Sequence, residues 1–170
     1  MTITEHIAAV RREMAEAARE SGRSERDIFL VGASKMNDAA ACQEAIAAGV
    51  NALGENRVQE MTAKLAQNAY DGAPLHFIGH LQRNKVGQVL GKAVLIHSVD
   101  SLRLARQIET DAAKAGLDVD ILLEVNVARE ESKYGFMLEE VEDAIMTIKD
   151  FPHVHIKGLM TIALFVENPE

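Results

Sequence analysis

The residue with the clearest chemical potential is Lys35, which directly follows the apolar run Ile28-Phe29-Leu30-Val31-Gly32-Ala33-Ser34. An ammonium group at the end of a buried strand incurs a desolvation penalty that favours the neutral amine. The neutral amine is the form that attacks a carbonyl to make a Schiff base. Alternatively, Lys35 extends its ammonium into solvent or pairs with Glu55. Spacing alone leaves both interpretations open.

Polar residues follow the other apolar runs of the sequence as well. They are Glu55-Asn56, Gly79-His80, Ser98-Val99-Asp100, the pair Glu124 and Asn126, and Met160-Thr161. Active sites of parallel β/α folds form at the carboxyl ends of the strands. Residues two apart in a strand share a face, so Glu124 and Asn126 point the same way. We therefore expect these groups to converge on one polar pocket above an apolar interior.

The histidines do not indicate a metal site. His76 and His80 are four residues apart in a predicted strand. From the rise of a strand they lie about 13 Å apart along it, which is too far to chelate one ion. His153 and His155 share a strand face but stand at the start of their strand, the end associated with stability rather than chemistry. No metal ligand is predicted.

The elements that must position these residues alternate along the chain. A first amphipathic helix opens with the capping-box pattern Thr2-x-x-Glu5 and ends at Ser21-Gly22. Strands are predicted at 28–34, 52–54, 75–78, 94–96, 119–127 and 154–162, the first of them buried on both faces. Helices are predicted at 38–48, 58–67, 84–90, 102–115 and 139–149. This alternation predicts an α/β fold of parallel β/α units, either a doubly wound sheet or part of an eightfold barrel.

Length and composition describe a single globular domain over residues 1–170, with 48% apolar and 26% charged residues. The chain has 18 Lys and Arg residues and 26 Asp and Glu residues, which gives a net charge of −8. It therefore lacks the excess of basic residues that is typical of a nucleic-acid-binding protein. No apolar run has the length of a membrane span, and the N-terminus lacks the pattern of a signal peptide. The lone Cys42 is predicted to be a small packing residue and fits a reducing cytoplasm.

Several longer motifs follow one another in a distinctive order. They are Val31-Gly32-Ala33-Ser34-Lys35, Gly54-Glu55-Asn56-Arg57-Val58-Gln59-Glu60, His76-Phe77-Ile78-Gly79-His80-Leu81-Gln82-Arg83-Asn84-Lys85, His97-Ser98-Val99-Asp100-Ser101, Glu131-Ser132-Lys133-Tyr134-Gly135-Phe136 and Gly158-Leu159-Met160-Thr161. This series resembles the pyridoxal phosphate homeostasis protein family, whose barrel is similar to the N-terminal domain of alanine racemase. The resemblance runs from Ile28 to the last residue, and its most specific part is the motif from His76 to Lys85.

The resemblance implies a (β/α)8 barrel of the TIM type, of which this chain carries the first six β/α units after an N-terminal helix. It implies that Lys35 holds pyridoxal 5'-phosphate as a Schiff base at the barrel mouth, with Asn56 beside the pyridine ring. The same mouth would be lined by His80, Ser98, Asn126 and Met160. Lys133 would be a second amine that handles the cofactor or, alternatively, a residue of a surface loop.

The sequence departs from the family in two places. Family members commonly follow the cofactor lysine with a stretch containing Lys and Pro, where this chain has Met36-Asn37-Asp38. The chain also stops at Glu170, after the sixth predicted strand, so relative to the family it is C-terminally incomplete. In the family the loops after strands seven and eight supply the phosphate cradle.

The resemblance implies a cytoplasmic protein that buffers or delivers pyridoxal phosphate, with little or no catalytic turnover. Its partners would be the cofactor and pyridoxal-phosphate-dependent apoenzymes, and the chain would be a monomer or weak homodimer. One alternative is an amino-acid racemase of the alanine racemase type, which needs two bases flanking the substrate α carbon. A further alternative is a partial barrel without ligand that serves only as an interaction protein.

Overall fold

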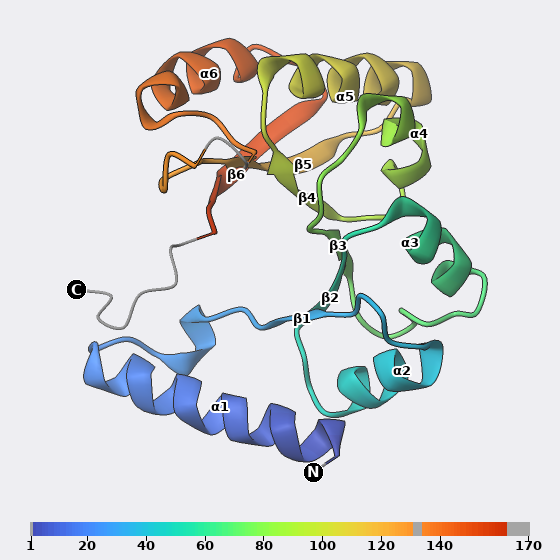
Figure 1. Cartoon of the computed structure of the whole chain (residues 1–170), viewed down its shortest axis with the longest axis vertical. Coiled ribbons are helices and arrows are strands. Elements are labelled where there is room, and N and C mark those ends of the chain that lie inside the picture. The colour runs from blue at the N-terminus through green and yellow to red at the C-terminus, as the bar shows by residue number, and fades with distance from the viewer. Residues whose placement is uncertain (1, 131–133, 163–170) are drawn as a thin grey trace. The chain divides into compact units, whose positions relative to one another are not determined.

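The computed structural model describes residues 2–130 and 134–162. Two compact units make up the chain, one reaching His76 and the other beginning at Phe77, and each is described by itself. The strand order follows the chain, β1-β2-β3-β4-β5-β6. Along the chain in Figure 1, strands alternate with helices, as the sequence predicts.

The elements match the predicted ones with small shifts at their ends. The strands are β1 (Val31–Ala33), β2 (Ala52–Glu55), β3 (Leu75–Phe77), β4 (Leu95–Val99), β5 (Val119–Glu124) and β6 (Val154–Met160). The α-helices are α1 (Ile3–Glu20), α2 (Ala39–Ala47), α3 (Val58–Leu65), α4 (Val86–Val89), α5 (Leu102–Ala115) and α6 (Val141–Ile148). Short 3-10 helices lie at Glu25–Asp27, Arg83–Lys85 and Leu138–Glu140.

In the first unit, α1 begins with the predicted capping box. The backbone N–H of Glu5 donates to the hydroxyl of Thr2, and the backbone N–H of Thr2 donates to the Glu5 carboxylate. Strands β1 and β2 are parallel, with Ala33 paired to Gly54. Every residue of β2 is buried.

The prediction that the first strand is buried on both faces is wrong. Strand β1 covers only three residues, of which two are half-buried and Ala33 is exposed. In the strand order β1 is the first strand and has β2 as its one neighbour, so its other edge has no described strand to cover it.

In the second unit, β4, β5 and β6 are parallel. Helix α5 has its N-cap at Ser101, whose hydroxyl accepts from the backbone N–H of Leu104, and ends at Gly116 in the left-handed conformation. Ile108 of α5 and Ile121 and Leu123 of β5 are fully buried and form part of the core of this unit. Among the described residues, no helix has the length and apolar character needed to cross a membrane.

Gly135 packs closely against the end of β5, next to Phe136, whose backbone forms a parallel bridge with Val125. Its φ is +120°, and a Cβ built there would lie 2.7 Å from the backbone nitrogen of Asn126 and 2.9 Å from the carbonyl oxygen of Glu124. We expect Gly135→Ala to lower the free energy of unfolding by about 2–4 kcal/mol, because both the positive φ and the backbone clash oppose a side chain. Chemical denaturation measures this difference.

The matched control for this prediction is Gly87→Ala. Gly87 lies in α4 at an ordinary φ with nothing within 4 Å of an added Cβ, so alanine should be neutral or mildly stabilising there. Equal stability of the two variants would show that the backbone at Gly135 tolerates a side chain.

Candidate functional site

Lys35 stands in a tight turn immediately after β1. The backbone N–H of Asn37 donates to the carbonyl oxygen of Ser34 at 3.1 Å, which makes Lys35 the second residue of a β-turn. The third residue, Met36, has a φ of +63°. Such a positive φ is uncommon for a residue other than glycine. The side-chain amide of Asn37 donates to the carbonyl oxygen of Lys35 at 3.1 Å, so the turn fixes the backbone from which the Lys35 side chain starts.

Lys35 itself is exposed, so the buried environment predicted for it is wrong. The alternative pairing with Glu55 is also wrong, because the ammonium that reaches Glu55 belongs to Lys64. With the described residues, the Lys35 ammonium makes no hydrogen bond or ion pair. Its amine is thus accessible to a ligand.

Asn56 follows β2 as Lys35 follows β1, so both residues lie at the carboxyl ends of two neighbouring parallel strands. Ala33 pairs with Gly54 in the parallel register, and Lys35 and Asn56 each follow two residues later. The side-chain oxygen of Asn56 is buried and accepts no hydrogen bond from any described residue. A buried acceptor without a donor is costly in a folded protein unless a ligand or water satisfies it.

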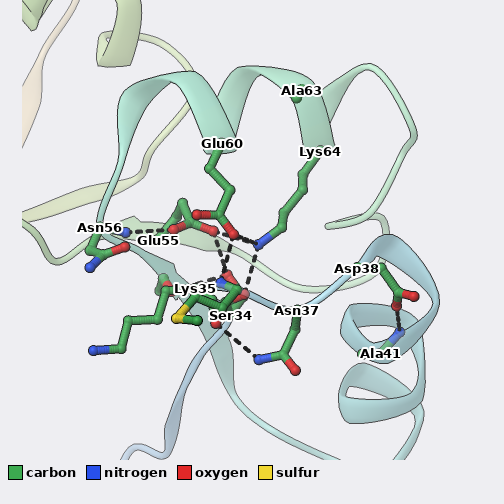
Figure 2. A network of polar contacts seen from close by, with 12 residues as sticks. Ser34, Lys35, Asn37, Asp38, Ala41, Glu55, Asn56, Glu60, Ala63 and Lys64 are labelled. Atoms are coloured by element: carbon green, nitrogen blue, oxygen red, sulfur yellow. Dashed lines mark hydrogen bonds and ion pairs between the residues drawn. The ribbon is translucent and has the colours of Figure 1, made fainter.

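A charge network formed by Ser34, Glu55, Glu60 and Lys64 lies next to these two residues (Figure 2). The ammonium of Lys64 donates to the Glu55 carboxylate at 2.7 Å, to the Glu60 carboxylate at 2.8 Å and to the carbonyl oxygen of Ser34 at 2.7 Å. The Ser34 hydroxyl lies 3.1 Å from the same Glu55 oxygen, and the backbone N–H of Asn56 donates to the other Glu55 oxygen at 2.8 Å. Both Glu55 and Lys64 are buried.

Within this network, the pKa values of Glu60 and Lys64 are shifted in the directions that keep both side chains charged. The hydrogen bond from Lys64 holds the pKa of Glu60 below its ordinary value. Burial by itself would lower the pKa of Lys64, but the hydrogen bonds with Glu55 and Glu60 outweigh it and the pKa is raised. Burial raises the pKa of Tyr70, whose hydroxyl lies 3.5 Å from Glu55.

Two of these network residues, Glu60 and Lys64, were not predicted as part of a site. Their spacing of four residues on a predicted helix is a signal for a helical ion pair. That signal does not reveal that the pair faces inward onto the Lys35 turn. Cys42, predicted to be a packing residue, is buried, and burial raises the pKa of its thiol.

In the second unit, His80 follows β3 and contacts two side chains, those of Asp100 and Tyr134. Its Nδ1 lies 3.2 Å from the Asp100 carboxylate, and its ring stacks on Tyr134 with centroids 3.8 Å apart. A carboxylate at this distance fixes the orientation of the imidazole. These three residues line one hollow of this unit, together with Arg83 and Arg103.

Ser98, Asn126 and Met160 lie at the carboxyl ends of β4, β5 and β6. The buried hydroxyl of Ser98 donates to the carbonyl oxygen of Gly79, the residue before His80. The side-chain amide of Asn126 donates to the carbonyl oxygen of Glu130 at 2.9 Å and so holds the loop that follows β5. The backbone carbonyl oxygen of Met160 accepts from the N–H of Val125 at 2.8 Å, which places Met160 beside the residue that precedes Asn126.

Glu124, the other residue predicted on the Asn126 face, is buried at the end of β5. Burial, and then the negative charge of Asp100, raise the pKa of its carboxyl group. Lys133 lies outside the described residues. Of the predicted cofactor residues, Lys35 and Asn56 belong to the first unit, and the others belong to the second.

Comparison with known proteins identifies the family. Residues 6–170 match the family described as the N-terminal domain of alanine racemase. A protein of Aquifex aeolicus named pyridoxal phosphate homeostasis protein is 39% identical over 170 residues, which cover 100% of this chain and 75% of the relative. The chain belongs to the pyridoxal phosphate homeostasis protein family. Membership confirms the predicted fold class, the barrel type of the alanine racemase N-terminal domain.

Solved structures agree with membership in the pyridoxal phosphate homeostasis protein family. A crystal structure of a protein from Bifidobacterium adolescentis matches with a TM-score of 0.90 and 37% identity, covering 98% of this chain and 71% of that chain. The structure of PipY from Synechococcus elongatus with pyridoxal phosphate bound matches with a TM-score of 0.76 and 32% identity, covering 91% of this chain and 73% of that chain.

Proposed function

We propose that this chain binds pyridoxal phosphate through Lys35 and serves in the homeostasis of that cofactor, with little or no catalytic turnover. The observation that carries the proposal is that an accessible lysine amine and the unsatisfied side-chain oxygen of Asn56 both follow the carboxyl ends of the neighbouring strands β1 and β2. The PipY relative, whose structure is described as having pyridoxal phosphate bound, supports the same ligand class for this chain.

The donor set around Lys35 fits this cofactor. When bound, pyridoxal phosphate supplies an aldehyde that condenses reversibly with a primary amine. Lys35 offers that amine, and the Asn56 oxygen offers an acceptor for a donor on the ligand. His80, Ser98, Asn126 and Met160 are proposed as further cofactor-binding residues, supported by their places at or just after the carboxyl ends of β3 to β6 and by the family resemblance.

The carboxylates of Glu55 and Glu60, near the Lys35 turn, are more consistent with binding of the cofactor than with catalytic turnover. Catalysis at an amino acid's α carbon needs a positioned base that can take up and release a proton. Within the first unit, the Glu55 and Glu60 carboxylates both accept from Lys64 and also bind backbone N–H groups, so neither is free to act as that base. This engagement removes the two carboxylates nearest to the Lys35 turn as candidate bases for the racemase alternative.

Further properties follow from the family and complete the proposal. We propose that residues 1–170 act as a single cofactor-binding domain in the cytoplasm, as a monomer or weak homodimer. The proposed recipients of the cofactor are pyridoxal-phosphate-dependent apoenzymes. These points are supported by the membership of the chain in the pyridoxal phosphate homeostasis protein family.

Titration of the chain with pyridoxal phosphate tests the proposal. We expect a saturable change in the visible absorption of the cofactor at one equivalent per chain. In deuterated water, alanine incubated with the loaded chain should take up deuterium at its α carbon no faster than in a control with free cofactor. Absence of saturable binding would contradict the proposal, and faster uptake would support a racemase instead.

A further inference from the structure

We propose that Glu60 and Lys64 are positioning residues for Lys35, which hold the two peptide groups on either side of it. This inference rests on the proposed function, because it concerns how the proposed attachment residue is presented. It adds a role for two residues of α3 that do not themselves bind the cofactor.

The two contacts fall on the two peptide groups that flank Lys35. Lys64 donates to the carbonyl oxygen of Ser34, which belongs to the peptide group before Lys35, at 2.7 Å. Glu60 accepts from the backbone N–H of Met36, which belongs to the peptide group after Lys35, at 2.7 Å. With both peptide groups held, the side-chain torsions are the remaining freedom of Lys35.

One helix sets both contacts at once. Glu60 and Lys64 are four residues apart on α3 and form an ion pair at 2.8 Å, so each fixes the other's side chain. Their hold also explains the backbone of Met36, which keeps a positive φ although it carries a side chain. Strained backbone of this kind persists where its surroundings determine it.

The same network reaches Asn56, the second proposed ligand-binding residue of this unit. The third hydrogen bond of Lys64 goes to Glu55, whose other oxygen accepts from the backbone N–H of Asn56. Lys64 thereby links the backbones of Lys35 and Asn56 through a single buried charge cluster. Figure 2 shows Lys64 approaching from α3 while the Lys35 side chain extends to the opposite side of the view.

Lys64 is not a competing attachment site. Its ammonium has three N–H donors, and its three acceptors are Ser34, Glu55 and Glu60. The side chain is also buried. Buried ion pairs are weak contributors to net stability and are better explained by the specific geometry that they impose, which here is the geometry of the Lys35 turn.

The test compares Glu60→Ala, Glu60→Gln and the control Gln59→Ala, an exposed residue of the same helix. Hydrogen exchange of the Met36 amide, measured by NMR without cofactor, reports on the turn itself. Titration with pyridoxal phosphate reports on the affinity, and exchange of the other α3 and β2 amides reports on general unfolding.

For Glu60→Ala we expect faster exchange at Met36 and affinity for pyridoxal phosphate lower by about tenfold, because the Met36 N–H loses its charged acceptor. Glu60→Gln retains an acceptor oxygen and should restore most of the Met36 protection, while Gln59→Ala should match the unsubstituted chain. Unchanged Met36 exchange in Glu60→Ala would overturn the inference. So would a loss of protection spread equally over α3 and β2, since that indicates a purely structural role.

Failure of the proposed function is distinguishable from failure of this inference. If the unsubstituted chain does not bind pyridoxal phosphate, the proposed function fails, and positioning for that cofactor fails with it. If the unsubstituted chain binds pyridoxal phosphate but substitution of Glu60 leaves the hydrogen exchange of the Met36 amide unchanged, only the positioning role is contradicted.

Discussion

Replacing Lys35 with alanine is expected to weaken the binding of pyridoxal phosphate by about a hundredfold or more, because the substitution removes the amine proposed to capture the aldehyde. The free energy of unfolding should change by no more than about 0.5 kcal/mol, as is usual for a surface substitution. The reason is that the side chain is exposed and makes no hydrogen bond or ion pair with the described residues. Absorbance titration and chemical denaturation measure the two quantities on the same preparation.

Two variants control this experiment. Lys35→Arg keeps the positive charge but cannot capture an aldehyde as an amine does, so it should lose binding as Lys35→Ala does. Lys92→Ala removes an exposed lysine of the second unit and should bind the cofactor as the unsubstituted chain does. Cofactor affinity retained in Lys35→Ala would remove Lys35 from the site.

The largest effect on stability is expected from Lys64→Met. This substitution leaves the fully buried Glu55 carboxylate without its ion partner. Breaking a buried pair from one side costs about 3–5 kcal/mol. We expect a correspondingly lower midpoint in thermal or chemical unfolding, or loss of folded chain altogether.

The double variant Glu55→Gln with Lys64→Met separates charge imbalance from loss of the contact. Neutralising Glu55 removes the uncompensated buried charge, so the double variant should recover a large part of the lost stability. The loss in free energy of unfolding is also measured for Glu55→Gln and Lys64→Met singly. If the loss in the double variant equals the sum of the two single losses, the two side chains do not stabilise each other.

Local patterns predicted the elements well where the signals lie close together in the chain. Helix α5 occupies the predicted range, because a capping serine at Ser101 precedes it and Gly116 ends it in the conformation that glycine favours. The capping box at Thr2 and Glu5 is a similar case. Alternation of apolar runs with amphipathic stretches was enough to predict a parallel α/β fold, and family membership then identified its barrel class.

The sequence predicted the surroundings of Lys35 less well. A short apolar run before a lysine predicts a buried strand end, but the observed strand stops at Ala33 and a turn carries Lys35 into solvent. The residues that hold this turn, Glu60 and Lys64, lie in a helix that follows a further strand of the chain. Periodicity places them on a helix and does not show which acceptors the Lys64 ammonium reaches.

In the second unit, too, the sequence did not predict which distant residues contact one another. His80, Asp100 and Tyr134 are far apart in the sequence and come together only after three different strands have formed. The sequence placed His80 and Asp100 at strand ends, and Tyr134 appeared only within a family motif. Pairing among such residues depends on loop paths that follow each strand, and composition and spacing carry no direct signal for those paths.

The most direct test of the central claim is the location of the cofactor after chemical reduction. The chain is incubated with pyridoxal phosphate, treated with borohydride, digested and analysed by mass spectrometry. We predict that the added mass is found on the peptide containing Lys35 and is absent from peptides containing Lys64. Added mass on a different lysine, or none at all, would contradict the assignment of Lys35 as the residue that captures the cofactor.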